Sequence, residues 1–238
     1  ALAAIEHNYG SAGVVLGIEI PVLYHFEAGF RFGMNWALGK TGGVDEVAVL
    51  VRMLRDRSQS VRKAAVLGLG LLNVKESIAP LQAIVAGKGE GCRLFGSRTV
   101  GTDVRAYAAA ALGLTGDDEF GNARRILIEV SGRRTENREV RVSALVALAN
   151  MRVPGAELGD LVSHLMAITR KPREDSFVQA HAIGALGRQL AHARQGAHAD
   201  AVDLLMRIAK SKMRGHMRTS AVIALGLCGG KSDQHEEI

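Results

Sequence analysis

The stretch WALGKTGG at residues 36–43 contains Gly39-Lys40-Thr41, the tripeptide with which a phosphate-binding loop ends. Such a loop needs another glycine five residues before the Gly-Lys pair, so that its backbone can curl around the phosphates. Met34 occupies that position, and Gly33 is one residue too far back. The preceding residues read as a helix rather than as the buried strand that the loop should follow. The tripeptide therefore does not indicate a nucleotide hydrolase.

The other residue types that carry chemistry are also poorly spaced for it. Cys92 and Cys228 lie far apart and form no CxxC pair, so they predict neither a disulfide framework nor a metal site. The eight histidines show no ligand spacing beyond His192 and His198, which flank a loop. We therefore expect no catalytic residues, no bound metal and no cofactor, and we expect the protein not to be an enzyme.

The composition indicates an all-helical protein. Hydrophobic residues make up 47% of the 238 residues and aromatic residues only 4%, with four prolines. The net charge of +6 is compatible with an anionic partner. No span is apolar enough to cross a membrane, no signal peptide is visible, and the two cysteines favour a reducing compartment such as the cytoplasm. Because the sequence starts at Ala1, we expect that residues upstream of it are missing.

A repeated helical pattern organises most of the chain. Apolar residues occupy the first, fifth, eighth, ninth and twelfth positions of each repeat, which places them on one face of a helix. The repeat starts are 31 to 43 residues apart, a period typical of stacked helical arrays. Six stretches share the pattern: FRFGMNWALGKT (30–41), VRKAAVLGLGLL (61–72), VRAYAAAALGLT (104–115), VRVSALVALANM (140–151), VQAHAIGALGRQ (178–189) and MRTSAVIALGLC (217–228).

A second amphipathic stretch precedes five of these helices. The stretches cover residues 44–56, 76–86, 120–131, 156–170 and 199–211. The pattern therefore predicts a solenoid of antiparallel helix pairs over residues 30–230, with about six units. We expect residues 1–29 to be a degenerate or truncated unit in which Pro21 and four glycines prevent a long helix, and residues 231–238 to begin a further truncated repeat or tail.

The pattern resembles HEAT repeats, in particular the short HEAT-like type found in phycobilisome lyases. The features that carry the resemblance are the Val-Arg that opens the second helix and the Ala-Leu-Gly that ends it. The resemblance implies an all-α, right-handed superhelix that acts as a scaffold or adaptor, or as an enzyme in a few cases. Deoxyhypusine hydroxylase, a diiron enzyme of this type, carries His-Glu pairs after the repeat arginine. Such pairs are absent from the repeats of this chain.

An arginine recurs at the second position of five repeats. The members of this arginine ladder are Arg31, Arg62, Arg105, Arg141 and Arg218, with Gln179 in the remaining repeat. Similarity to HEAT-like folds implies that these arginines pair with acidic residues in neighbouring turns, for which Asp56, Asp103, Glu139 and Asp175 are candidates. A partner-binding groove is the alternative role.

Three sets of residues are candidates for binding a partner. Tyr107, Ser143, His181 and Ser220 share the fourth position of their repeats and would form a polar row, where a solenoid binds an extended partner. The glycine-rich insertion at 87–103 carries Lys88, Arg93 and Arg98, and insertions in repeat arrays often bind. The third set is Lys210, Lys212 and Arg214.

Charge divides between the two kinds of turn. The turns within repeats carry a total formal charge of +7, and the turns between repeats carry a total of −9. The sequence therefore predicts one basic edge and one acidic edge.

We conclude that the chain is a non-catalytic protein-binding scaffold or adaptor in a larger assembly. A nucleic-acid-associated protein that uses the basic edge is the alternative, although one tryptophan and three tyrosines offer little base stacking. A bilin-lyase-like enzyme is the second alternative.

Overall fold

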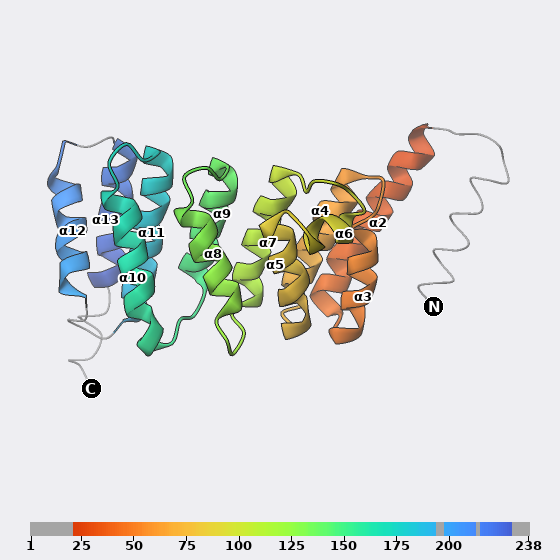
Figure 1. The fold of residues 1–238 in the computed structure, drawn as a ribbon, viewed down its shortest axis with the longest axis horizontal. Helices are drawn as coiled ribbons and strands as arrows, with labels where there is room; N and C mark the ends of the chain where they lie inside the picture. The colour runs from red at the N-terminus through yellow and green to blue at the C-terminus, as the bar shows by residue number, and fades with distance from the viewer. Residues whose placement is uncertain (1–20, 194–197, 213–214, 230–238) are drawn as a thin grey trace.

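The structure is a single row of antiparallel helix pairs (Figure 1). The computed structural model describes residues 21–193, 198–212 and 215–229, with side chains described from residue 31. The first helices of the pairs are α3 (Val44–Met53), α5 (Ile78–Ala86), α8 (Asn122–Gly132), α10 (Gly155–Arg170) and α12 (Ala199–Lys210). The second helices are α2 (Pro21–Thr41), α4 (Gln59–Leu71), α7 (Thr102–Thr115), α9 (Arg138–Asn150), α11 (Ser176–His192) and α13 (Gly215–Gly229).

This arrangement confirms the predicted fold class, an all-α solenoid. Each second helix packs against the second helix before it, and the described residues contain no β-strand. Within the same residues, no helix is both long enough and apolar enough to cross a bilayer. Five second helices begin two residues before the predicted repeat starts, because polar residues such as Asn137 and Asp175 cap them from outside the apolar pattern.

The N-terminal helix differs from the prediction. The sequence suggested that Pro21 and the glycines would prevent a long helix before residue 30, but α2 runs without interruption from Pro21 to Thr41. Proline is well tolerated at the first position of a helix, where its missing N–H has no helical partner. Residues 1–20 lie outside the described part of the chain, as do residues 230–238.

Small residues allow the second helices to pack closely. A methyl group added at Gly70, Gly113 or Gly187 would lie 2.4–2.7 Å from an alanine of the next second helix. The alanines in contact are Ala111, Ala147 and Ala224 respectively. These glycines occupy the tenth position of their repeats and the alanines the eighth. The Ala-Leu-Gly ending is therefore a packing motif between neighbouring repeats.

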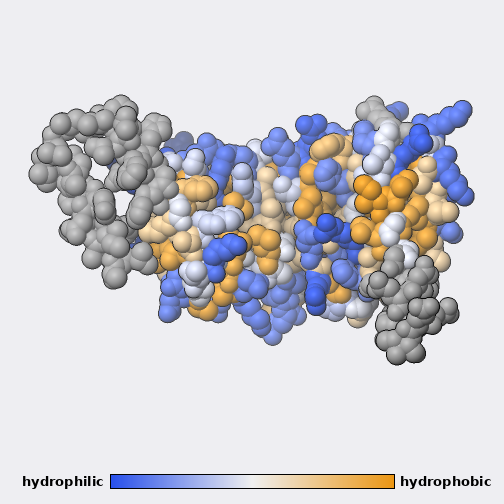
Figure 2. Space-filling model, turned by 180° about the vertical axis from the view of Figure 1, so that it is seen from behind, coloured by the Kyte–Doolittle hydropathy of each residue, from blue (hydrophilic) through white to orange (hydrophobic). Residues whose placement is uncertain are grey.

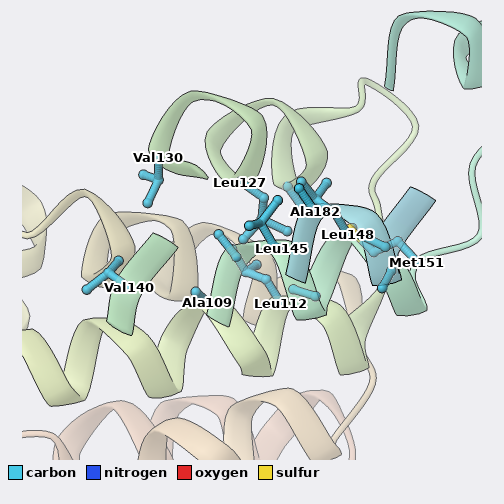
Figure 3. Close-up of a cluster of buried hydrophobic side chains, with 14 of the residues drawn as sticks. Ala109, Leu112, Leu127, Val130, Val140, Leu145, Leu148, Met151 and Ala182 are labelled. Atoms are coloured by element: carbon cyan, nitrogen blue, oxygen red, sulfur yellow. The ribbon is translucent and has the colours of Figure 1, made fainter. Parts of the chain in front are cut away.

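Leucines fill the space between the two layers of helices. Leu69, Leu112, Leu148 and Leu186 are fully buried at the ninth position of their repeats, as the pattern predicts. Figure 3 shows Leu112 and Leu148 among the side chains of α8, α9 and neighbouring helices. The prediction that Leu225 is buried to the same extent is wrong, because Leu225 is only partly buried. The described structure has no helix pair beyond α13 to cover it.

The insertion after α5 contains a short helix that the sequence did not predict. Helix α6 (Glu90–Phe95) packs against α5. The guanidinium group of Arg55 donates hydrogen bonds to the carbonyl oxygens of Arg93 (2.8 Å) and Leu94 (3.2 Å). The insertion is therefore a packed part of the solenoid rather than an open glycine loop.

Candidate functional site

The Gly39-Lys40-Thr41 tripeptide lies in the last turn of α2, as the repeat alignment predicts. The Lys40 ammonium group lies 5.9 Å from the centre of the Trp36 ring, and the Thr41 hydroxyl donates a hydrogen bond to the carbonyl of Ala37 (2.9 Å). A helical backbone keeps its N–H groups for its own hydrogen bonds, so they cannot encircle a phosphate. The tripeptide ends a helix.

One face of the second helices carries a line of exposed hydrophobic side chains. We call this surface the open face and define it by five residues on four helices: Trp36, Tyr107, Leu114, Val146 and Phe177. Their side chains are 39–50% exposed. Seen from behind in Figure 2, hydrophobic residues lie across the middle of the solenoid, between two hydrophilic edges. The open face runs along successive repeats, so it can contact an extended partner.

Cationic side chains accompany the aromatic residues of the open face. Lys63 lies 5.6 Å from the Tyr107 ring centre and Arg138 lies 5.8 Å from that of Phe177. The His181 ring packs 4.6 Å from the Phe177 ring, and its Nδ1 lies 2.8 Å from the carbonyl oxygen of Phe177. These contacts hold the aromatic rings in place while one side of each stays accessible. The surface therefore offers ordered aromatic and cationic groups together.

The predicted polar row borders the open face. Tyr107 is exposed, whereas Ser143, His181 and Ser220 are half-buried on α9, α11 and α13. The residues predicted from the sequence occupy only the fourth position of each repeat, so Trp36 and Val146 at the seventh position were not among them. The signal was available, because the fourth and seventh positions lie on one side of a helix.

Two central members of the arginine ladder form buried clamps with glutamates. Arg105 donates to both carboxylate oxygens of Glu136 (2.9 and 2.7 Å), and Arg141 donates to both oxygens of Glu174 (2.8 and 2.9 Å). The Nε group of each arginine also donates to a backbone carbonyl, that of Val85 or Ser131. Each clamp joins two neighbouring repeats, and the fork of an arginine is well suited to such two-point contact.

The remaining ladder positions have different contacts. Arg31 forms an ion pair with Asp56 (2.8 Å), and Arg62 donates to the carbonyl oxygens of Asp56 and Arg57 (2.6 and 3.1 Å). Gln179 donates to the carbonyls of two residues in its preceding turn (3.0 and 3.2 Å). Arg218 is exposed.

In the described part of the chain, three of the four acidic partners named from the sequence are not paired with a ladder arginine. Asp103 pairs with Lys63 (2.6 Å) instead of with an arginine, Asp175 caps α11, and Glu139 is exposed. The clamp acids instead lie four residues before the next repeat begins. Glu136 and Glu174 sit there, in the turn, where the long arginine side chain reaches across from the previous repeat.

The clamps lower the pKa values of their carboxyl groups. The hydrogen bonds from Arg141 are the main cause of a pKa of about 2 for Glu174. Burial raises the pKa of Glu136, but the hydrogen bonds from Arg105 and the N–H of Asn137, with the charge of Arg105, outweigh burial and lower it. Both acids are therefore ionised at neutral pH.

The basic edge is more basic at its surface than the sequence total suggests. We define it by its exposed lysines and arginines in the turns within repeats: Arg55, Arg57, Lys88, Arg93, Arg98, Arg133, Arg134, Arg138, Arg170, Arg173, Lys210 and Lys212. Asp56, Asp103, Glu136 and Glu174 lie in the same turns but are less exposed, because they are hydrogen-bonded inside the edge. Arg214 lies outside the described residues.

A serine and a histidine form a contact that superficially resembles a catalytic pair. The Ser131 hydroxyl lies 2.9 Å from His164 Nε2, and burial lowers the pKa of His164. Ser131 is fully buried, so a substrate cannot reach its hydroxyl. The part of the chain that the structure describes contains no cluster of three or more His, Cys, Asp or Glu side chains that could hold a metal ion.

Comparison with known proteins gives likeness to solved structures but not to known sequences. No family model matches the sequence, and no curated protein matches it either. A solved structure of a designed armadillo repeat protein, YIII(Dq)4CqI, is similar with 18% sequence identity and a TM-score of 0.48. The likeness covers 83% of this chain and 92% of the designed protein.

Proposed function

We propose that this protein is a non-catalytic scaffold that binds an extended segment of a partner protein along the open face. The observation that carries the proposal is the line of half-exposed hydrophobic side chains, three of them aromatic, on α2, α7, α9 and α11. Aromatic side chains such as Trp36, Tyr107 and Phe177 are the types that most often anchor protein interfaces. The Val-Arg opening and Ala-Leu-Gly ending of the repeats support its assignment to the short HEAT-like type.

The open face also has the composition of an interface. Hydrophobic side chains lie in its middle and charged side chains lie along both edges, as in the apolar centre and polar rim of protein interfaces. The cations beside the rings, Lys40, Lys63 and Arg138, favour a partner segment that carries acidic residues next to apolar ones. The polar row would then supply hydrogen bonds to the partner.

Affinity capture from native extract with matched variants tests this function. The open-face variant carries Trp36→Ala, Tyr107→Ala and Phe177→Ala. The control variant carries Val44→Ala, Phe120→Ala and Met206→Ala, which remove hydrophobic side chains that are 40–75% exposed and lie outside the open face. We expect the wild type and the control to retain the same partner and the open-face variant to lose it, with unchanged circular dichroism. Equal retention by all three chains would contradict the proposal.

The exposed cations of the basic edge favour a second candidate function, nucleic-acid association. Twelve lysines and arginines of this edge are exposed, whereas only three of its described acids are: Glu90, Glu139 and Asp175. A phosphate backbone that followed the edge would release counterions, so affinity would fall linearly on a plot of log affinity against log salt. Duplex DNA and single-stranded RNA titrations at several salt concentrations test this candidate. Weak, salt-insensitive binding would exclude it.

A further inference from the structure

An exposed arginine on α11, Arg188, lies in line with the open face. It occupies the eleventh position of its repeat, the position that Leu114 of the open face occupies on α7. Its guanidinium group donates a hydrogen bond to the side-chain oxygen of Asn150 at the same position of α9 (2.7 Å). Within the described part of the chain Arg188 forms no ion pair, whereas Arg105 and Arg141 are each paired with a glutamate.

The hydrogen bond to Asn150 orients the guanidinium group without neutralising its charge. A neutral amide oxygen accepts from one of the N–H donors of an arginine and leaves the others for a second acceptor. Arg188 is therefore a cation that is held in place and can bind a carboxylate through two parallel hydrogen bonds. A group that is oriented in advance loses less conformational entropy when it binds.

The approach to Arg188 from the open face is unobstructed. Gly184 lies one helical turn before Arg188, and a methyl group added at Gly184 would meet nothing within 4 Å. Val146 occupies the same seventh position on α9 and is 42% exposed. The main chain of a partner segment can therefore come closer to α11 than to α9.

Apolar residues of the open face precede Arg188 along the solenoid. Leu114 on α7 and Val146 on α9 are 50% and 42% exposed. The axes of helices that pack together are about 8–10 Å apart, and an extended chain advances about 3.3 Å per residue. A partner segment that runs along the open face therefore advances by about three residues from one second helix to the next.

We propose that Arg188 selects the partner segment by binding the carboxylate of an aspartate or glutamate, about three residues from the apolar residue that packs on Leu114 and Val146. The inference rests on the proposed function, because it concerns the same surface and the same class of partner. A basic residue at this point of the segment would be repelled, and a neutral one would leave the charge of the guanidinium group unmatched. Arg188 is thus a specificity-determining residue.

Selection from a display library of random peptides tests the inference. The wild-type chain should enrich peptides that carry an acidic residue about three positions from a bulky apolar one. Arg188→Glu should enrich peptides with a basic residue at that point instead. The control is Arg207→Glu, which reverses the charge of an exposed arginine on α12 in the other layer of helices. It should select the same peptides as the wild type.

The affinities of one selected peptide identify the contact. Replacing the acidic residue of the peptide by the corresponding amide should weaken its binding to the wild type about tenfold, because a hydrogen-bonded charge pair is lost. Arg188→Gln should weaken binding of the unchanged peptide by a similar factor. The two changes together should cost no more than either alone, since both remove the same contact. Fluorescence anisotropy of the labelled peptides measures the four affinities.

The outcomes separate the role of Arg188 from the function on which it rests. If the wild type enriches no peptide more than the open-face variant does, both are overturned. If the open-face variant loses the selected peptides while Arg188→Glu selects the same ones as the wild type, partner binding stands and the role of Arg188 is overturned. Additive losses in the four affinities would also overturn it, because Arg188 and the acidic residue would then act independently.

Discussion

The repeat of α8 and α9 and the repeat of α12 and α13 share one sequence pattern and differ in burial. Leu148 in α9 is fully buried, and its equivalent Leu225 in α13 is only partly buried. Arg141 is clamped by Glu174, whereas its equivalent Arg218 is exposed. The difference shows that burial at a repeat position depends on the neighbouring repeats as well as on the residue's own helix pair.

The largest effect should come from removing the central leucine. Leu148→Ala should lower the free energy of unfolding by about 4 kcal/mol, because it leaves a leucine-sized cavity in a site with no access to solvent. Leu225→Ala should cost less than half as much. Urea denaturation of both variants measures the two values. Equal losses would mean that the C-terminal repeat is covered as fully as the central one.

The next largest effect concerns the Arg141–Glu174 clamp. The pKa of Glu174 is about 2 in the folded chain and near 4.5 when unfolded, so the clamp stabilises the fold by about 3 kcal/mol above pH 5. This contribution decreases as pH falls from about 5 to about 2, since the unfolded chain takes up the proton first. Glu174→Gln should therefore be less stable than the wild type at pH 7 and equally stable near pH 2.

Thermal melts at several pH values measure this dependence. Glu139→Gln is the control, because Glu139 lies in the neighbouring turn and is exposed. Its melting temperature should follow that of the wild type at every pH. A Glu174→Gln chain with the wild-type pH profile would show that the clamp adds no stability.

The smallest effect on stability is expected at the C-terminal end of the basic edge. Replacing Lys210, Lys212 and Arg214 with glutamine should change the unfolding free energy by less than about 0.5 kcal/mol, as exposed substitutions usually do.

The same triple substitution should flatten the salt dependence of any nucleic-acid binding. If a protein partner docks at this edge instead, duplex binding should stay weak and co-purification of the partner should be lost. Tight duplex binding abolished by the change would favour the nucleic-acid function.

The helices could be predicted from the sequence because every repeat has the same spacing of apolar residues and a similar ending motif. The glutamates that clamp the arginines could not be predicted from a repeating pattern. Glu136 and Glu174 lie in turns, where spacing varies and the acidic residues outnumber the arginines that use them. One signal was present: Gln179 replaces the arginine where the following turn, KSKMR, contains no acid.

The open face was only partly predictable. The polar row was placed on the correct helices, but exposure of Trp36 and Val146 depends on how closely the small residues let neighbouring helices approach. Aromatic residues at helical spacing are usually core residues, so the sequence alone does not separate the two cases. The partial burial of Asp56, Asp103, Glu136 and Glu174 in the basic edge also depends on side-chain contacts, which charge counts do not reveal.

The two clamps close stretches of chain of similar length. Arg105 and Glu136 are 31 residues apart, and Arg141 and Glu174 are 33 residues apart. Contacts this local in sequence favour fast folding, because little chain entropy is lost before each one forms. Under mechanical tension, such a molecule would extend in steps of about one helix pair. The helix pairs around Arg141, whose clamp joins two repeats, would resist longest.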